Sequence, residues 1–531
     1  MNAERYDVAI VGYGPGAQCL AALLARAGHR VFACERYPHL HNLPRAGHID
    51  HETLRLVQGL GDAEAFAGTL WEVRGDYVWL NAGGELLMLQ PALETGEAVS
   101  GWWSDYTQWQ PNLEAVFDAS ARASGADVLL GWQAVGLEQQ ASGVTLTIER
   151  TALDSRGRPR PIGERRAVQA RYLVGADGAG SFVREALGIA REDLGADQRW
   201  LDVDMRTVRT IDLRPNIGQI CDPARPRMLM PLGASHRRFE WMLLPHETIE
   251  EMERPAAAWA LLQEFGVTPD THEIARQIVY TFQARIAERW RDGNVLLTGD
   301  AAHTMPPFAG QGLLSSLRDS SNLAWKLDLV LGGRAPAALL DTYESERRPH
   351  VRAWTDISLA EGRVSCELDP ARAAERDRRM ISGEHPVPPH LPMLGPGAFQ
   401  RHPDGFVGSL GLQARVAVPR GVGRFDDLLG PRRWALLTRG GAPRDHLDGA
   451  QLRVLSGLDA IAREVLPAGS APRDSAIVDV DGRYEAWMDG HGVQAVLTRP
   501  DFAVFGAAPR LADLPDLIDS LARRLKEVLV A

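Results

Sequence analysis

A glycine-rich turn near the N-terminus constrains the fold of this chain more than any other feature. The segment Gly12–Ala17 reads GYGPGA, follows the apolar run Tyr6–Val11, and precedes apolar residues at helical spacing up to Ala27. A second β-rich run, Arg30–Cys34, completes a strand, turn, helix, strand order with connections of normal length. This order predicts a βαβ unit in a parallel sheet.

The glycines of this turn match the GxGxxG/A pattern of dinucleotide-binding folds. The first glycine permits a tight turn, the second lets the backbone approach a pyrophosphate, and the small last residue allows close helix packing. The free N–H groups and partial positive charge at the helix N-terminus then face the phosphates. Residues expected at this site are Gly12, Gly14, Pro15, Gly16 and Ala17.

Glu35 strengthens this interpretation because it ends the second strand, about twenty residues after the first glycine. A carboxylate at this position can accept hydrogen bonds from a ribose diol, which favours an adenosine without a 2′-phosphate. The alternative is a glycine turn in a βαβ unit that binds no nucleotide.

Two later segments each place an aspartate beside a glycine where a predicted strand ends. Asp177–Gly178 follows the strand Tyr172–Val174, and Gly299–Asp300 follows the strand Val295–Leu297. A carboxylate at this sheet edge can orient backbone amides or accept from a ribityl hydroxyl, which suits a cofactor stretched between an adenosine and a second ring system. Each segment alone is typical of an ordinary turn, so the prediction depends on their combination.

Composition limits the remaining classes of protein. The 531 residues carry a net charge of −11, which argues against nucleic acid as a partner. The four cysteines are widely separated, without CxxC or CxxH spacing, so neither a disulfide framework nor a zinc site is expected. We find no basic leader and no apolar run of about 18 residues. These features predict a soluble, cytoplasmic protein of about two to four domains, without a membrane partner.

The pattern of elements along the chain predicts an α/β fold with a central insertion. Residues such as Phe239–Leu244 alternate between apolar and polar, which indicates a mixed sheet. Long helices are expected over Gly312–Leu331, from Leu339 to about Ser358, and over Leu514–Val530. The arginine-rich stretch 150–166 is interpreted as a solvated hairpin connection, with a basic anion patch as the alternative. The expected boundaries are 1–187 and 285–385 for two parts of one nucleotide-binding domain, 188–284 for a sheet domain, 386–407 for a proline-containing linker, and 408–531 for a C-terminal domain.

With these segments in this order, the chain resembles the FAD-dependent aromatic hydroxylases, which are single-component flavoprotein monooxygenases with the p-hydroxybenzoate hydroxylase fold. The likeness extends from the glycine turn through Arg45 and Arg318–Leu327 to Tyr343–Pro349, and covers nearly the whole chain. It implies a Rossmann-like FAD-binding domain, an inserted mixed β-sheet substrate domain, and a thioredoxin-like C-terminal domain without CxxC. It also implies FAD as cofactor, NADPH or NADH as transient reductant, O₂ as co-substrate, and no metal.

The resemblance further implies which residues hold the FAD. Arg45 and Gln110 are expected at the diphosphate and ribityl chain, and Asp300 at the ribityl chain or the pyrophosphate. The loop Gly310–Leu313 opens a helix whose N-terminus is expected to face the N1–C2 edge of the flavin, where negative charge gathers on reduction. The further expected cofactor residues are Glu35, Arg36, Asp177, Gly178, Gly299, Gly310, Gln311, Gly312 and Leu313.

The implied substrate is a small phenol that is hydroxylated ortho to its own hydroxyl. The segments 44–46, 221–226, 237–240 and 499–501 are similar to the branch of the family that acts on 3-(3-hydroxyphenyl)propanoate or 3-hydroxycinnamate. Two alternatives stay open. One is a flavin monooxygenase that tailors a larger aromatic natural product, and the other is a non-catalytic protein that binds FAD and a ligand. A monomer or a homodimer is expected.

Four residues are expected to act on the substrate. Pro307 lies where the family's backbone carbonyl approaches the substrate ring, and His48 is expected to accept a proton because the unperturbed pKa of a histidine suits this role. The alternative for His48 is a structural histidine. Arg238 is expected to meet a substrate carboxylate, with a solvated face as the alternative, and Trp241 is expected to line the substrate pocket.

Overall fold

The computed structural model describes residues 5–89, 96–384 and 391–526, and its first sheet contains the predicted parallel unit. Strand β1 (Arg5–Val11) pairs in parallel with β2 (Val31–Glu35) and with the end of β11 (Pro159–Gly175). Helix α1 (Pro15–Arg26) connects β1 to β2, so the βαβ prediction is confirmed. The order of the sheet is β19-β20-β11-β1-β2-β8, where β8 is Asp127–Leu130, β19 is Arg291–Asp292 and β20 is Val295–Leu297.

The loops that follow these parallel strands meet at one edge of the sheet. Gly12 N donates to Cys34 O at 2.8 Å, and Ala176 N donates to Val11 O at 2.8 Å. Thr298 N donates in turn to the carbonyl at the end of β11 at 3.0 Å. The glycine turn and the two Asp- and Gly-containing segments therefore lie side by side, as the carboxyl ends of neighbouring parallel strands should.

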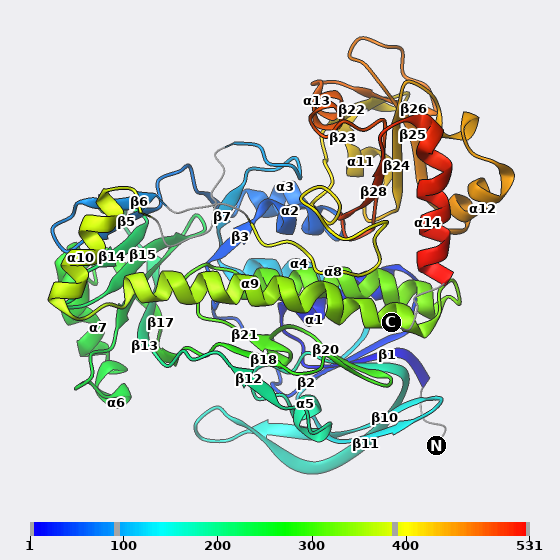
Figure 1. Cartoon of the computed structure of the whole chain (residues 1–531). Helices are drawn as coiled ribbons and strands as arrows, with labels where there is room; N and C mark the ends of the chain where they lie inside the picture. The colour runs from blue at the N-terminus through cyan, green and yellow to red at the C-terminus, as the bar shows by residue number, and fades with distance from the viewer. Residues whose placement is uncertain (1–4, 90–95, 385–390, 527–531) are drawn as a thin grey trace.

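Two long helices cross the middle of the molecule (Figure 1). Helix α8 spans Gly312–Leu331, as predicted, and packs on α1, where Ser320 Oγ donates to Gly16 O at 2.8 Å. Helix α9 spans Asp341–Ser365, so it begins slightly later and ends later than predicted, because the residues before it form a 3₁₀ turn. Within the described residues, no helix combines the length and the apolarity needed to cross a bilayer.

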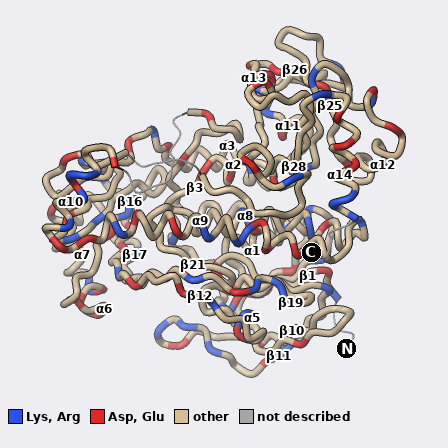
Figure 2. Tube along the Cα trace, viewed as in Figure 1, with Lys and Arg blue, Asp and Glu red and all other residues tan. Residues whose placement is uncertain are grey.

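The arginine-rich stretch 150–166 belongs mostly to paired strands. Strand β10 (Gly143–Leu153) pairs with β9 (Trp132–Gln140) on one side and with β11 on the other, which confirms a hairpin with longer strands than predicted. Its charges are matched across the hairpin, since Arg165 Nε lies 2.7 Å from Glu149 Oε2. Figure 2 shows basic and acidic residues mixed along the described chain.

The second sheet, with the order β17-β13-β16-β15-β14-β5-β6, is assembled from two separate parts of the chain. Strands β13 to β17 come from the segment predicted as a mixed sheet. Strands β5 (Val78–Asn81) and β6 (Leu86–Leu89) come from well before residue 188 and are too short to show a clear alternation in the sequence. The remaining strands are β13 at Arg199–Thr207, β14 at Gly218–Cys221, β15 at Arg227–Leu232, β16 at His236–Met242 and β17 at His272–Thr281.

The two faces of this second sheet have different surroundings. On β16, Phe239 and Trp241 point into an apolar core that also includes residues of α7 (Pro255–Leu262). Arg238 and Glu240 point to the opposite face and line a large cavity. Side chains alternate along a strand, so β16 separates aromatic core residues from charged cavity residues.

The C-terminal domain, orange to red in Figure 1, has a third sheet with the order β23-β22-β26-β25-β24-β27-β28. Helix α14 (Leu514–Lys526) closes it, and residues 527–530 of the predicted helix lie outside the described residues. Residues 391–407 of the predicted linker contain neither helix nor strand, and residues 386–390 lie outside the described part of the chain. The strands are β22 at Arg415–Val418, β23 at Gly421–Arg424, β24 at Ala435–Arg439, β25 at Ile461–Leu466, β26 at Ala476–Asp479, β27 at Ala495–Thr498 and β28 at Val504–Ala508.

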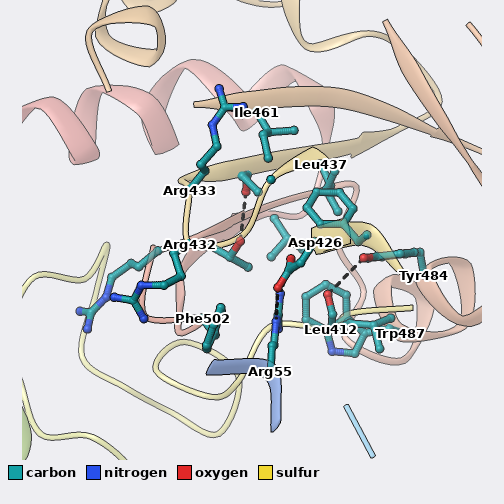
Figure 3. Close-up of a pocket in the computed structure, with 16 residues that line it drawn as sticks. Arg55, Leu412, Asp426, Arg432, Arg433, Leu437, Ile461, Tyr484, Trp487 and Phe502 are labelled. Carbon is teal, nitrogen blue, oxygen red and sulfur yellow. Dashed lines mark hydrogen bonds and ion pairs between the residues drawn. The ribbon is translucent and has the colours of Figure 1, made fainter. Parts of the chain in front are cut away.

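Buried ion pairs join the C-terminal domain to the rest of the chain. Figure 3 shows Arg55 against Asp426, where Nε and Nη2 donate to the two carboxylate oxygens at 2.7 and 3.1 Å. Arg499 donates to Glu346 of α9 at 2.8 Å, and Lys326 of α8 lies 3.0 Å from the same carboxylate. Removing one partner of a buried pair costs about 3–5 kcal/mol, so the loss of a single charge would destabilise the contact of the C-terminal domain with α8 and α9.

Candidate active site

A cavity of about 1580 Å³ opens between the edge of the first sheet, the inner face of the second sheet and the C-terminal domain. A site for one small molecule typically occupies ~300–1,000 Å³, so this cavity has room for an elongated cofactor and a second molecule. The predicted site residues that line it are Gly14, Pro15, Gly16, Ala17, Arg45, His48, Gln110, Gly178, Arg238, Gly299, Asp300, Pro307, Gly310, Gln311, Gly312 and Leu313.

The glycine turn presents an open helix N-terminus to this cavity. Gly14 is the N-cap of α1 and no side chain caps the helix, so the first N–H groups of α1 lack an intrahelical partner. A Cβ atom at Gly14 would meet nothing within 4 Å, which marks open space next to the turn. Gly12 lies behind the turn. Its φ is +90°, and a Cβ atom there would lie 2.4 Å from Ala176 O.

Glu35 and Arg36 lie beside the glycine turn but do not line the cavity. Glu35 accepts from Tyr13 N at 3.0 Å through one oxygen and from Tyr37 N at 3.1 Å through the other. The carboxylate therefore fixes the conformation of the turn and keeps further acceptor capacity. Arg36 is exposed, and its carbonyl accepts from Thr151 Oγ1 at 2.6 Å. Their contact with a ribose stays a prediction.

Asp177 is not among the residues that line the cavity, because its carboxylate serves the local turn, and its contact with the cofactor stays a prediction. One oxygen accepts from Ser181 Oγ at 2.5 Å and the other from Val183 N at 3.1 Å. An aspartate just ahead of a short helix readily satisfies free backbone N–H groups at the helix start. Asp177 thus orders the turn that places Gly178 on the cavity wall.

A residue that the sequence did not single out, Asp319, organises the Gly299–Asp300 segment. Its Oδ2 accepts from Gly299 N at 3.1 Å and lies 2.7 Å from His303 Nε2, while Arg347 Nε donates to Oδ1 at 2.8 Å. Burial raises the pKa of Asp319, but the charges of His303 and Arg347 outweigh it, so the pKa lies below its ordinary value. The buried carboxylate holds this loop so that the side chain of Asp300 opens into the cavity.

Arg45 differs from the other arginines that line the cavity. It is exposed and forms no ion pair with any described residue, whereas Arg318 pairs with Asp50 and Glu52. Arg238 and Arg347 are paired in the same way. An unpaired guanidinium at a cavity wall is suited to a phosphate, which it can bind through two parallel hydrogen bonds.

Gln110 binds the backbone of the residue that follows Arg45. Its Oε1 accepts from Ala46 N at 2.8 Å, and its Nε2 donates to Glu114 Oε1 at 2.7 Å. Both ends of the amide are therefore engaged within the protein. Gln110 therefore holds the Arg45–Ala46 loop in place. Its direct contact with a cofactor stays a prediction.

A second open helix N-terminus faces the cavity at α8. The loop residues Gly310–Leu313 line the cavity, and Gln311 at the N-cap makes no side-chain cap, because its Oε1 accepts from Arg318 at 2.8 Å instead. The positive end of this long helix dipole stabilises negative charge within about one turn of the helix start. This geometry suits the flavin edge on which charge develops, and the contact itself stays a prediction.

His48 lies on the cavity wall and bridges two loops. Its Nε2 lies 2.8 Å from Asp105 Oδ1 on β7 (Asp105–Thr107), and its Nδ1 lies 3.4 Å from Gly310 O. Burial lowers the pKa of His48. The hydrogen bond and the charge of Asp105 raise this pKa by more than burial lowers it, so it lies above its ordinary value. Pro307 also lines the cavity, and its carbonyl accepts from Gly310 N at 2.8 Å.

Trp241, predicted to contact substrate, lies on the wrong face of its strand. It is fully buried in the apolar core behind the second sheet, and its indole Nε1 donates to Glu264 at 3.0 Å. Because side chains alternate along β16, its neighbour Glu240 takes the cavity position instead. The polar positions of β16, Arg238 and Glu240, indicated in the sequence which face of the strand lines the cavity.

Arg238 does line the cavity, but it is surrounded by carboxylates. It forms two hydrogen bonds with Asp204, at 2.7 and 3.0 Å, and lies 3.0 Å from Asp202 and 3.5 Å from Glu240. Its remaining nitrogen donates to Arg45 O at 2.6 Å. The positive charge of Arg238 is therefore neutralised within the protein. The alternating acids of Leu201–Met205, in an otherwise apolar strand, were the sequence signal for this cluster.

The comparisons with known proteins agree with this geometry. The model of the FAD binding domain family matches residues 5–358, and that of the HcaD C-terminal domain matches residues 408–524. A probable NADH-specific resorcinol 4-hydroxylase of Rhodococcus jostii is 36% identical over 541 residues, which cover 99% of this chain and 96% of that protein. A 3-(3-hydroxy-phenyl)propionate/3-hydroxycinnamic acid hydroxylase of Klebsiella pneumoniae is 32% identical over 520 residues, which cover 93% of this chain and 90% of that protein.

Solved structures give the same fold. The ternary complex of aklavinone-11 hydroxylase with FAD and aklavinone matches with a TM-score of 0.75 at 26% identity, over 99% of both chains. The flavin-dependent monooxygenase PieE, with a TM-score of 0.79 at 23% identity, covers 98% of this chain and 99% of its own, and shows likeness of fold.

The fold and the cavity thus define a flavoprotein monooxygenase with a dinucleotide site beside a substrate pocket. The chain belongs to the FAD binding domain family, and it is an FAD-dependent aromatic hydroxylase. The predicted α/β fold, family and cofactor are confirmed. The residues fit FAD, since two open helix N-termini and the unpaired Arg45 supply the donors that a diphosphate and a flavin edge require.

Proposed function

We propose that this enzyme hydroxylates a small, uncharged phenol of the resorcinol type, ortho to one of its hydroxyls. One oxygen atom of O₂ enters the ring, the other leaves as water, and NADH or NADPH supplies the two electrons. The observation that carries this proposal is the neutralisation of Arg238 by Asp202, Asp204 and Glu240 on the substrate side of the cavity.

A substrate with a carboxylate, such as 3-(3-hydroxyphenyl)propanoate, needs a free cation in its pocket. Arg238 was the predicted partner, and its charge is already matched. Adding a further carboxylate beside three buried acids leaves a desolvated negative charge unpaired, which is strongly unfavourable. Arg45 remains unpaired, but it lies beside the glycine turn and is needed for the diphosphate. A neutral dihydroxybenzene avoids this conflict, and the 36% identical relative is named for resorcinol.

Different residues of the chain act on the cofactor and on the substrate. When bound, FAD supplies the redox chemistry that activates O₂. Arg45 and the glycine turn bind its diphosphate, and the N-terminus of α8 stabilises negative charge at the flavin edge. Neutral His48 donates its Nε2–H to Asp105, which leaves Nδ1 as the atom that accepts the phenolic proton in this proposal. Trp200 and Phe282 pack against Phe308 with ring centroids 5.8 and 5.7 Å away, and exclude water from this end of the pocket.

The test compares three substrates on the purified holoenzyme. NADH and NADPH oxidation are followed with resorcinol, phenol and 3-(3-hydroxyphenyl)propanoate, and hydroxylated product is quantified by mass spectrometry. We expect product to match the NAD(P)H consumed with resorcinol, and kcat/KM to be at least about tenfold higher than with the propanoate, which corresponds to ~1.4 kcal/mol. A preference for the propanoate would overturn the proposal. No phenol-dependent NAD(P)H oxidation and no product with any phenol would favour the non-catalytic binding protein.

A larger aromatic substrate is the second candidate. The size of the cavity favours it, and so does the likeness to a hydroxylase that was crystallised with aklavinone. Adding a polycyclic hydroxyanthraquinone to the same panel tests it, because a higher kcat/KM for the polycycle than for resorcinol would replace the first proposal with this one.

A further inference from the structure

Among the described residues, Glu240 carries the one carboxylate that lines the cavity from the second sheet. Glu240 on β16 lies opposite Asp202 on β13 and opposite Met228 on β15. Met228 in turn lies opposite Gln219 on β14, and Met228, Gln219 and Glu240 all line the cavity. A row of side chains therefore crosses the substrate face of the sheet, and Glu240 is the anionic residue of this row that reaches the cavity.

Glu240 also lies between the two loops that approach the substrate from the cofactor side. Two residues away along β16, Arg238 donates to Arg45 O at 2.6 Å, which connects that end of the wall to the Arg45–His48 loop. Two residues away in the other direction, Met242 lies opposite Trp200, whose ring packs 5.8 Å from Phe308 in the other loop. The space next to Glu240 is therefore where a ring held between these loops would lie.

The carboxylate of Glu240 has unused acceptor capacity. The side chain is about nine-tenths buried, and it forms no hydrogen bond with any described residue. Among the described residues, Arg238 is the cation within ion-pair distance, at 3.5 Å, and it already donates to Asp204 and to Arg45 O. A buried carboxylate accepts several hydrogen bonds when they are offered, and leaving them unmade is costly. A donor that enters the cavity can therefore bind to this carboxylate.

A phenolic hydroxyl is the donor that fits. Burial is the main cause that raises the pKa of Glu240 to about 7, while Arg238 lowers it and Asp204 raises it further. A carboxylate in this range accepts strongly from a hydroxyl, whereas a second carboxylate would be repelled. When a 1,3-dihydroxybenzene is hydroxylated at carbon 4, the hydroxyl on carbon 3 is adjacent to the reacting carbon and the hydroxyl on carbon 1 is para to it. The second hydroxyl is free for recognition.

We propose that Glu240 accepts a hydrogen bond from the ring hydroxyl that is para to the site of oxygen insertion, and so selects 1,3-dihydroxybenzenes over monohydric phenols. This assignment rests on the proposed function and names the residue that sets its specificity. Glu240 touches the substrate and takes no part in the redox steps.

The test uses two ligands that differ at this hydroxyl, resorcinol and 3-methoxyphenol. Each is titrated into the oxidised holoenzyme without NADH, and the change in flavin absorbance gives Kd; kcat/KM is measured separately. We expect wild-type protein to bind resorcinol about 10- to 100-fold more tightly, the range for one hydrogen bond to a charged group. Glu240→Met should bring this ratio close to one, mainly by weakening resorcinol. Glu240→Gln, which keeps an oxygen acceptor without charge, should give an intermediate ratio.

Glu273→Gln is the matched control, because Glu273 lies on β17 of the same sheet but is more than half exposed and pairs with Arg206. It should leave the ratio unchanged, and FAD content and melting temperature confirm that each variant is folded. If Glu240→Met does not fold, the wild-type ratio still decides, since equal binding of the two ligands overturns the assignment. An unchanged ratio in a folded Glu240→Met also overturns it, while resorcinol turnover keeps the proposed function. Absence of resorcinol binding and turnover in wild-type protein overturns the proposed function itself.

Discussion

Replacing Gly14 with alanine should separate cofactor binding from folding. Gly14 has φ −76° and ψ 179°, which alanine adopts without strain, and the added Cβ would meet no atom within 4 Å. Alanine is a poorer N-cap than glycine, but it reduces the freedom of the unfolded chain by about 0.4–1 kcal/mol. The two effects are similar in size, so the stability of the apoprotein should change by less than about 1 kcal/mol.

The same methyl group projects into the space at the helix N-terminus, where the diphosphate is expected. Displacing the phosphate from one backbone N–H removes a charge-assisted hydrogen bond of about 1.5–3 kcal/mol. FAD affinity should therefore fall about 10- to 150-fold. The assay titrates apoprotein with FAD by quenching of flavin fluorescence, and compares apoprotein melting curves.

Gly12→Ala is the contrasting variant. Its Cβ would lie 2.4 Å from Ala176 O at a φ of +90°, so the backbone itself must shift, and the left-handed conformation alone costs about 1–2 kcal/mol. This variant should lose thermal stability as an apoprotein, whereas Gly14→Ala should not. If Gly14→Ala binds FAD as tightly as wild-type protein, the diphosphate does not lie at this helix, and the reasoning from Gly14 fails.

Three further predictions concern single side chains. Arg45→Met should weaken FAD binding about tenfold or more while leaving the melting temperature of the apoprotein nearly unchanged, because this arginine is exposed and unpaired; a large loss of stability would contradict this. Glu346→Gln should destabilise the protein by about 3–5 kcal/mol in urea unfolding, since it leaves buried Lys326 without its carboxylate partner and Arg499 with Asp501 alone. Burial alone would raise the pKa of Glu346, but its cationic partners lower it to about 2, so in wild-type protein its stabilisation is complete above its ordinary pKa and is lost as the pH falls toward 2. Asp105→Asn should lower the pKa of His48, because burial then acts without the opposing carboxylate; the acidic limb of the kcat/KM profile should move to lower pH, and an unmoved limb would exclude His48 as the proton acceptor.

The sequence was sufficient for the parts of the fold that depend on local signals. The βαβ unit and α8 follow from turn residues and helical spacing, and both are found where predicted. The sequence was insufficient where a side chain's role depends on strand orientation. Trp241 and Glu240 are adjacent, and their pattern allows either one to face a cavity; the structure selects Glu240 because the aromatic face packs against α7.

The supporting residues of the site were the hardest to predict. Three aspartates bind site residues from distant parts of the chain. His48 contacts Asp105, Arg238 donates to Asp204, and Gly299 N donates to Asp319. No short sequence motif connects the members of these pairs. Asp177 shows the reverse case. It lies in a segment of the expected type, yet its carboxylate serves the local turn. Motif spacing locates a loop, whereas tertiary packing decides which of its atoms reach a ligand.

The buried ion pairs between the C-terminal domain and α8 and α9 limit how such enzymes can exchange parts. Asn322 Nδ2 donates to Asp501 and Glu346 at 2.9 and 2.8 Å, and Arg499 joins the same two carboxylates. A C-terminal domain from a relative would need an arginine and an aspartate at the positions of Arg499 and Asp501. Without them, buried charged groups of α8 and α9 would lack partners at the interface. The two halves of the molecule must therefore be inherited, engineered or recombined as one matched set.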